Sequence, residues 1–345
     1  MKKVLKLTIA LIIILTTLVS YSVNTSCKSF NLEVEVPLKV AVLLYKANDT
    51  YIAEVSKNLV EIQKQNQGKV EFIFFDGNGD QKTQNESLDM VLKEKYDLLF
   101  LNLVDINSAK TAINKIKQTN IPVVLYNREP NVNIIREYTK AIYIGSNIKE
   151  GGDLQGDVVT QEWNNNKGLI DKNRDGIMQY IMLEGDPNNP EAIGRTKYSV
   201  QTIHEAGIKT EQLGLEICNW NRELAHIATT NFYLRFGDKI EVIIANNDEM
   251  AIGAIQALQT FNSNKGDKNR TIPVVGVDAI PEAQDYIKKG FMAGTVIQDA
   301  NAMAKAMYIA GMNLISGKVA TYNTEYKFDE TGVIIRIPYK RYEQK

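Results

Sequence analysis

Short apolar runs alternate with longer amphipathic stretches along almost the whole chain. Continuous apolar runs rich in β-branched residues predict strands at Leu38–Tyr45, Val70–Phe75, Leu98–Asn102, Val123–Tyr126, Tyr180–Leu183, Ile208–Leu215, Val242–Ala245 and Val274–Val277. Amphipathic periodicity predicts helices near Tyr51–Gln65, Thr83–Lys93, Ala109–Gln118, Glu150–Asn164, Ala192–Glu205, Glu249–Gln259 and Asn301–Ile315. Apolar strands separated by helices are typical of parallel sheets that are covered on both faces. We therefore predict an α/β fold.

A short internal repeat indicates two similar lobes. The segment Ile121–Val124 (Ile-Pro-Val-Val) recurs as Ile272–Val275. Each copy follows a predicted strand that ends in an asparagine, and each precedes a polar cluster: Asn127-Arg128-Glu129 in the first and Asp278 in the second. A four-residue match alone can arise by chance, but the whole order is shared. We predict two doubly wound lobes whose polar strand ends face one another across a cleft.

Length and charge narrow the class of protein. The chain has 345 residues and a formal net charge of −1, with no long basic run, so nothing in it indicates a nucleic-acid partner. A repressor of similar fold would need a helix-turn-helix before the first lobe. An apolar run occupies that place instead. The length favours two domains over one.

The first residues predict export. Lys2 and Lys3 precede the run Val4–Val19, in which Lys6 is the only charge, and small polar residues follow. This layout is typical of a secretory signal peptide, assigned here to residues 1–26. The run is short for a membrane span of about 20 residues, although an uncleaved anchor is the alternative. Cys27 stands where bacterial lipoproteins carry their lipid, so residues 27–37 are expected to form a tether at the outer face of a membrane.

A calcium loop is predicted at residues 171–179. Oxygen side chains at loop positions one, three, five and nine, with Gly176 at position six, match the start of an EF-hand loop. The expected ligands are Asp171, Asn173, Asp175, the carbonyl of Ile177, and Gln179. Met182 occupies position twelve, where a bidentate glutamate is required, so the last carboxylate must come from elsewhere. The alternative is an ordinary polar surface turn.

Catalytic signatures are not found in the sequence. His204 and His226 have no ligand or catalytic spacing around them, and neither a Gly-x-Ser-x-Gly motif nor a phosphate-binding loop occurs. We therefore do not expect an enzyme. After removal of the signal, Cys218 is the only cysteine besides Cys27, so no disulfide is expected within the folded part.

Six collinear motifs resemble the family of periplasmic galactose/glucose-binding proteins. They are Tyr45-Lys46 with Asp49, Asn102–Asp105, Asn127–Pro130, Gly185–Pro187, Ile244–Asp248, and Gly276–Asp278 with Pro281–Ala283. The resemblance implies a type 1 periplasmic binding protein: two lobes joined by a three-segment hinge, closing on a sugar and delivering it to an ABC permease. The implied lobes are 38–146 plus 299–334, and 147–298 plus 335–345. Glu241 is implied as the missing calcium ligand. A monomer is expected, with a chemoreceptor as a further partner.

The resemblance also implies the sugar site. Asp49, Asn127, Glu191, Arg195, Asn247 and Asp278 would bind the ring hydroxyls, and Tyr51 and Trp220 would cover the two ring faces. Arg128, Asn189 and Gln298 complete the set. Five of these positions differ from the family pattern as the chain carries Tyr51, Arg128, Asn189, Glu191 and Gln298 where Phe, Lys, His, Asp and Asn are usual. Asp49 could instead cap a helix, and Trp220 could be core.

We expect a hexose, galactose or glucose, as the ligand. The alternative is a sugar-sensing ectodomain held by an uncleaved N-terminal helix.

Overall fold

The computed structural model describes residues 36–343. The predicted signal peptide and Cys27 lie outside these described residues. Within residues 36–343, no helix combines the length and the apolar character that a membrane crossing requires.

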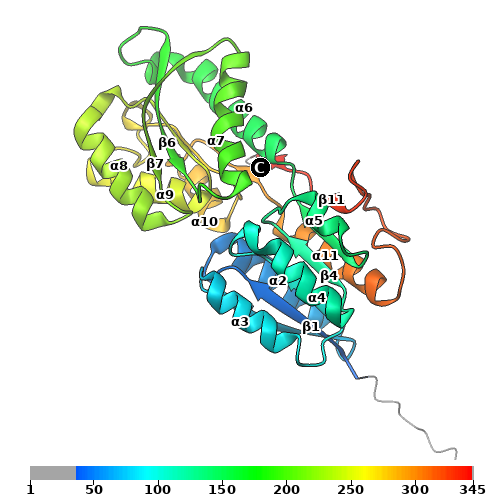
Figure 1. Ribbon diagram of the computed structural model, residues 1–345. Coiled ribbons are helices and arrows are strands. Elements are labelled where there is room, and N and C mark those ends of the chain that lie inside the picture. The colour runs from blue at the N-terminus through cyan, green and yellow to red at the C-terminus, as the bar shows by residue number, and fades with distance from the viewer. Residues whose placement is uncertain (1–35, 344–345) are drawn as a thin grey trace, which may run out of the picture. The chain divides into compact units, whose positions relative to one another are not determined.

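The first lobe contains a six-stranded sheet with the order β11-β5-β4-β3-β1-β2, and all its strand pairs are parallel (Figure 1). Its strands are β1 (Leu38–Leu44), β2 (Val70–Asp76), β3 (Leu98–Leu101), β4 (Val123–Tyr126), β5 (Ala141–Gly145) and β11 (Ile334–Arg336). Helices α2 (Thr50–Gln65) and α11 (Ala300–Ile315) pack on one face. Helices α3 (Gln81–Val91), α4 (Ala109–Thr119) and α5 (Val132–Arg136) pack on the other. Both faces are therefore covered, as apolar parallel strands require.

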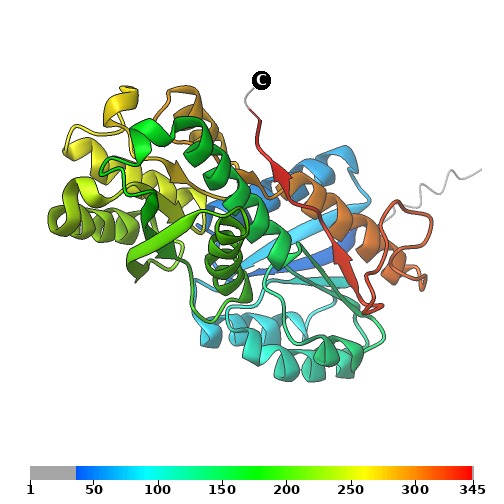
Figure 2. The same cartoon turned by 90° about the horizontal axis from the view of Figure 1, so that it is seen from above.

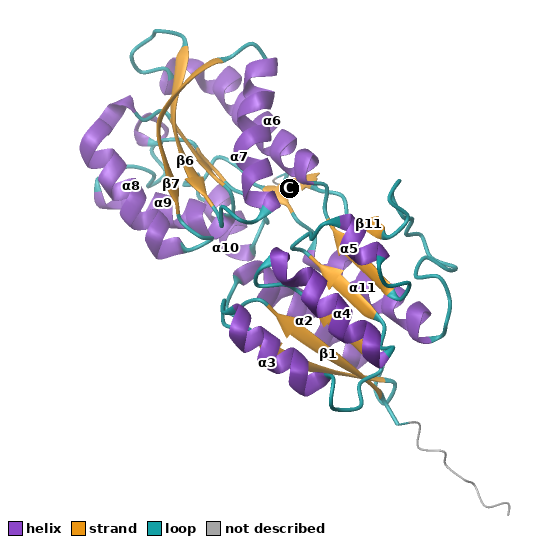
Figure 3. Ribbon diagram, in the orientation of Figure 1, coloured by secondary structure: helices purple, strands orange, loops and turns teal. Residues whose placement is uncertain are grey.

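The second lobe contains a four-stranded parallel sheet with the order β7-β6-β8-β9 (Figure 3). Its strands are β6 (Ile177–Glu184), β7 (Lys209–Ile217), β8 (Val242–Ala245) and β9 (Val274–Val275). Helices α6 (Ile148–Ile170) and α7 (Pro190–Glu205) cover one face. Helices α8 (Arg222–Phe236), α9 (Asp248–Thr260) and α10 (Pro281–Lys288) cover the other. The predicted fold class, an α/β protein with two doubly wound lobes, is confirmed.

Three chain segments connect the lobes. The first lies between β5 and α6, and the second between β10 (Val296–Ile297) and α11. The third runs from β11 to β12 (Lys340–Arg341), which pairs antiparallel with β10. In Figure 2 this red C-terminal segment passes beside the green helix α6, where the backbone N–H of Tyr339 donates to Glu150 at 3.1 Å. Because β11 pairs with β5, the first sheet extends to Arg336, two residues past the limit implied for that lobe.

The internal repeat corresponds to equivalent strands. β4 begins in the first Ile-Pro-Val-Val copy and pairs with β3, while β9 begins in the second copy and pairs with β8. All eight predicted strands and seven predicted helices overlap observed elements. The prediction omitted β5, β10, β11, β12, α5, α8 and α10. Most of these are short, but α8 is long and its apolar residues Leu224, Ile227 and Leu234 are exposed, so its sequence lacks a clean buried stripe.

Two glycine substitutions test the packing of the second lobe. A Cβ at Gly253 in α9 would collide with the backbone carbonyl oxygen of Arg222, whereas one at Gly168 in α6 would meet nothing within 4 Å. Gly253→Ala should lower the free energy of unfolding by about 1–3 kcal/mol, because backbone must shift. Gly168→Ala, the matched control, should raise it by up to about 1 kcal/mol through helix propensity. Equal effects in urea unfolding would contradict the close contact between α8 and α9.

Candidate ligand-binding site

Buried asparagines organise the carboxyl ends of both sheets. In the first lobe, Asn102 accepts from the backbone N–H of Tyr45 at 3.5 Å and donates to the carbonyl of Tyr126 at 3.0 Å. In the second lobe, Asn246 accepts from the backbone N–H of Gly185 at 3.0 Å. Each asparagine thus joins its own strand end to the loop after the neighbouring strand. The strand ends of the two lobes are built in the same way.

Three predicted sugar ligands are also helix N-caps. Asp49 accepts from the N–H of Ile52 at the start of α2, Asn189 caps α7, and Asn247 caps α9. The alternative prediction that Asp49 caps a helix is therefore confirmed, and Oδ1 makes that bond. The other carboxylate oxygen, Oδ2, accepts a hydrogen bond from the hydroxyl of Tyr45. Capping fixes these side chains at helix N-termini, where the positive end of the helix dipole favours oxygen atoms.

All eleven predicted sugar-site residues line one cavity, which we call the inner cavity. Its lining is Asp49, Tyr51, Asn127, Arg128, Asn189, Glu191, Arg195, Trp220, Asn247, Asp278 and Gln298, together with Tyr45. The motif containing Tyr45 carried the family resemblance, but the sequence did not assign the residue to the site. The cavity has a volume of about 30 Å³, room for about two water molecules. These side chains must move apart before a larger ligand can enter.

Arg195 is the most heavily bonded side chain of the inner cavity. Its guanidinium donates to the carbonyl of Asn246 at 2.7 Å, to Tyr339 at 2.8 Å, to Gln298 at 2.9 Å and to Glu191 at 3.3 Å. Burial by itself would lower the pKa of Arg195, but Tyr339, Glu191 and the carboxylate of Asp278 raise it above its ordinary value. The buried cation therefore stays charged. Tyr339 was not predicted from the sequence, since no local motif marks it.

Four buried polar atoms in the inner cavity have no hydrogen-bond partner among the described residues. They are the Tyr51 hydroxyl, Glu191 Oε1, Arg195 Nε and Gln298 Nε2. An unsatisfied buried polar group costs about 1–3 kcal/mol. Burial also raises the pKa of both Glu191 and Asp278. Donors and acceptors converge here, so the cavity suits a neutral ligand that carries several hydroxyl groups.

The backbone is strained around Trp220. Its φ is +62°, an uncommon left-handed conformation for a bulky residue, and Asn219 before it has φ +49°. A side chain at Gly185 would collide with the indole ring, so glycine permits this close approach. In the first lobe Asn127 has φ +62°, and in the second Asp278 has φ +122°. Strain of about 1–3 kcal/mol per residue is typical of ligand sites.

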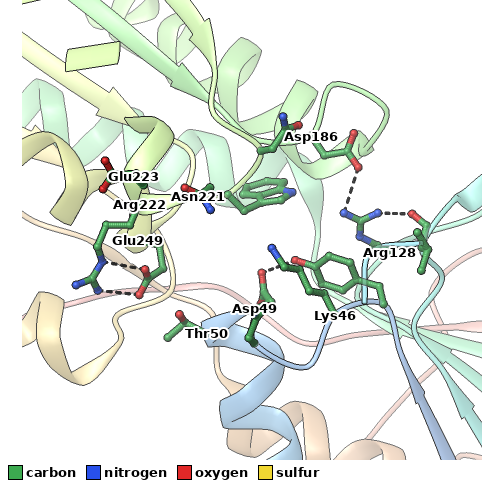
Figure 4. Close-up of a pocket in the computed structure, with 15 residues that line it drawn as sticks. Lys46, Asp49, Thr50, Arg128, Asp186, Asn221, Arg222, Glu223 and Glu249 are labelled. Atoms are coloured by element: carbon green, nitrogen blue, oxygen red, sulfur yellow. Dashed lines mark hydrogen bonds and ion pairs between the residues drawn. The ribbon is translucent and has the colours of Figure 1, made fainter. Parts of the chain in front are cut away.

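Arg128 connects the two lobes. Its guanidinium lies over the ring of Tyr45, 4.1 Å from the ring centroid, and donates to the carboxylate of Asp186 in the second lobe at 3.1 Å (Figure 4). It also donates to the carbonyl of Val104. Because Arg128 is buried, removal of its partner Asp186 would leave a buried charge without a counter-ion.

The predicted calcium loop joins α6 to β6. Glu241 accepts from the backbone N–H groups of Lys172 at 2.9 Å and Gln179 at 3.1 Å, so it lies against the loop. Asp171 Oδ2 accepts from Gly176, while Asp171 Oδ1 is buried and has no partner among the described residues. Within residues 36–343 no three His, Cys, Asp or Glu side chains form a metal-ligating group. A metal here would also need amide and carbonyl oxygens, which Asn173, Ile177 and Gln179 can supply, and this oxygen set fits Ca²⁺.

The histidines lie away from this chemistry. His204 is exposed in α7 beside Thr210, and His226 is half-buried in α8. Neither lines the inner cavity.

Asp248 holds the loop that carries Asp278. Its carboxylate accepts from the hydroxyl of Thr295 at 2.6 Å and from the backbone N–H of Ile280 at 2.9 Å. Burial raises the pKa of Asp248 to about 7, and hydrogen bonds only partly offset this.

The raised pKa predicts a pH dependence of stability. The pKa of Asp248 in the folded protein exceeds its ordinary value of 3.8, so the folded state binds this proton more tightly than the unfolded state does. This binding contributes its whole stabilisation below about pH 4, and the contribution is lost as the pH rises through about 7. The free energy of unfolding of the wild type should therefore fall relative to Asp248→Asn over this range, by up to about 4 kcal/mol. Urea unfolding between pH 5 and 8 measures this. A constant difference between the two proteins would contradict the assignment, and exposed Asp238→Asn is the control.

Comparisons with known proteins agree with this architecture. Residues 40–319 match the family model described as a periplasmic binding protein domain. The chain is 36% identical over 304 residues to the D-galactose/methyl-galactoside binding periplasmic protein MglB of Haemophilus influenzae, covering 87% of this chain and 88% of that protein. It is 31% identical to a putative rhizopine-binding protein of Rhizobium meliloti, covering 70% of this chain and 74% of that one.

Solved structures of solute-binding proteins have the same fold as this chain. An ABC transporter solute binding protein from Bacillus halodurans with bound myo-inositol superimposes with a TM-score of 0.72 at 25% identity, covering 89% of this chain and 95% of that chain. A periplasmic solute binding protein from Actinobacillus succinogenes with bound D-allose gives 0.73 at 20% identity, covering 89% and 97%, and shows the fold alone. The chain therefore belongs to the periplasmic binding protein family, whose members act outside the cytoplasm as binding proteins and not as enzymes.

Proposed function

We propose that the protein is the extracytoplasmic sugar-binding component of an ABC importer and that it binds a hexose, galactose or glucose, in the inner cavity. The observation that carries the proposal is the group of four buried, unpartnered polar atoms on residues that line that cavity. The similarity to a relative named for D-galactose and methyl-galactoside supports the choice of hexose.

The chemistry of a pyranose matches the lining. Its hydroxyls radiate from the ring edge and pair with carboxylates, amides and guanidinium groups, which Asp278, Asn247 and Arg195 provide. Its C–H faces are apolar and pack on aromatic rings, here Tyr51 and Trp220. Burial raises the pKa of the Tyr51 hydroxyl, which therefore stays protonated as a hydrogen-bond donor. Each buried sugar hydroxyl left unpaired would weaken binding by about 1–3 kcal/mol.

Binding is proposed to proceed by closure of the lobes. A hexose is larger than the present inner cavity, so it enters when the lobes separate and is enclosed when they approach. Closure is favoured if the sugar contacts both lobes in the closed form and mainly one in the open form. Asp49 and Asn127 belong to the first lobe, and Arg195 and Asp278 to the second. The permease would recognise the closed form.

Two further predictions concern attachment and signalling. Lipidation of Cys27 would hold the protein at a membrane, and an uncleaved N-terminal helix is the alternative; both fall outside the described residues. A chemoreceptor partner also stays a prediction. None of these changes the proposed ligand.

A calorimetric titration tests the ligand. Galactose, glucose, ribose, arabinose and myo-inositol are each added to the fragment that starts at Lys28. We expect saturation by galactose or glucose, and Trp220→Ala should weaken the Kd of that sugar at least about tenfold because the stacking face is lost. Trp163→Phe is the control, since Trp163 is buried in the second lobe and does not line the inner cavity. Saturation by myo-inositol or a pentose alone would reject the hexose assignment.

We also propose that the loop at residues 171–179 binds one structural calcium ion with Glu241. The support is the buried unpartnered Oδ1 of Asp171 and the contact of Glu241 with both ends of the loop. An ion there would neutralise the carboxylates of Asp171, Asp175 and Glu241. It would join α6 and β6 to the start of β8.

Calcium should therefore stabilise the protein without being needed for sugar binding. Calcium at about one hundred times its Kd should raise the free energy of unfolding by about 2.7 kcal/mol, which EDTA removes. Asp171→Asn should lose most of this gain, while the nearby exposed Asp238→Asn should keep it. Differential scanning calorimetry gives the melting temperatures. The same melting temperature in calcium and EDTA would reject the site, and hexose binding abolished by EDTA would reject a purely structural role.

A further inference from the structure

A second, larger cavity adjoins the inner cavity. Tyr45, Asp49, Arg128 and Trp220 line both cavities, so the two cavities lie next to one another. The second cavity, which we call the outer cavity, has a volume of about 400 Å³ (Figure 4). Small-molecule sites commonly occupy about 300–1,000 Å³, so the outer cavity is large enough for a ligand group of its own.

The outer cavity persists where the lobes already touch. Arg128 of the first lobe and Asp186 of the second form their ion pair at 3.1 Å, and both line the cavity. The inner cavity, by contrast, has room for about two water molecules. The outer cavity is thus bounded by an ion pair between the two lobes. It stays open although the side chains of the inner cavity lie close together.

The charges of the outer cavity favour a neutral polar occupant. Two of its cations are already paired: Arg128 with Asp186, and Arg222 with Glu249 at 2.9 Å. Arg222 also pairs with Glu282 at 2.6 Å. Lys46 is the remaining cation of the lining. The carboxylates in the lining, Asp49, Asp186, Glu223 and Glu249, outnumber the three cations, so an anionic group such as a phosphate is disfavoured.

Hydroxyl groups suit this lining better. Asn48, Asn219 and Asn221 contribute amides, and Thr50 contributes a hydroxyl. Trp220 belongs to both cavities, so its indole offers apolar surface to each.

We propose that the outer cavity is a second sugar subsite and that the protein binds disaccharides of hexoses, with one ring in the inner cavity and the second ring in the outer cavity. The inference rests on the proposed hexose function and extends its ligand class. In such a complex the glycosidic bond would lie beside the residues that line both cavities, which include Trp220 and the Tyr45–Arg128 pair.

Calorimetry with a cavity-filling variant tests the inference. Asn48 is exposed and lines the outer cavity but not the inner one, so Asn48→Trp should fill the second subsite alone. The ligands are galactose, glucose, lactose, melibiose, cellobiose and maltose. In the wild type, at least one disaccharide should bind with a Kd within about tenfold of that of its hexose, at one ligand per protein, and should compete with the hexose. Asn48→Trp should weaken disaccharide binding at least tenfold and change hexose binding less than twofold, while Asn48→Ala should change hexose binding equally little.

Three results would overturn the inference while leaving the hexose function intact. They are hexose binding with no disaccharide binding, equal weakening of both ligand classes in Asn48→Trp, and simultaneous binding of hexose and disaccharide. A thermal melt of Asn48→Trp shows that the variant is folded. Binding of neither class by the wild type would overturn the proposed function itself, so the two failures are distinguishable.

Discussion

The site is built around one buried cation, Arg195. Arg195 is 2% exposed, so its guanidinium must find hydrogen-bond acceptors inside the protein, because loss of hydration without partners would cost several kcal/mol. It finds them on elements that are far apart in sequence: the strand end at Asn246, Gln298 in the second connection between the lobes, and Tyr339 in the third. Its Nε is buried and has no hydrogen-bond partner among the described residues, and Arg195 lines the inner cavity. The proposed ligand site and the connecting segments therefore meet at a single side chain, which would link sugar binding to the proposed closure of the lobes.

The remaining geometry follows from a strand-end design that both lobes share. A parallel sheet presents the carboxyl ends of its strands along one edge, and a buried asparagine there fixes the neighbouring loop, as Asn102 and Asn246 do. Helices that start from these loops carry their capping side chains into the same region, so Asp49 and Asn247 stabilise helices and line the cavity at once. Capping, loop bracing and strained backbone all hold polar groups in place before a ligand arrives, which limits the entropy lost on binding.

Much of this could be predicted from the sequence, and the exceptions have physical causes. Apolar runs separated by helices were sufficient to predict the parallel sheets. The family resemblance was sufficient to identify eleven residues that line one cavity. Tyr339 could not be found in this way: it contacts Arg195 across 144 residues of sequence, and nothing beside it in the chain marks a contact. Helix α8 was missed because Leu224 and Ile227 face solvent, which removes the periodic stripe that reveals a buried helix. The outer cavity depends on where loops from both lobes meet, and local patterns carry no such information.

The unpartnered atoms of Tyr51, Glu191, Arg195 and Gln298 are proposed to surround a hexose held between the two lobes. A crystal structure of the protein with galactose or glucose tests it most directly. We expect a pyranose ring between Tyr51 and Trp220, with its hydroxyls within hydrogen-bond distance of those atoms and of Asp278. A hexose bound elsewhere, or one in the cavity that leaves these four atoms without partners, would contradict it.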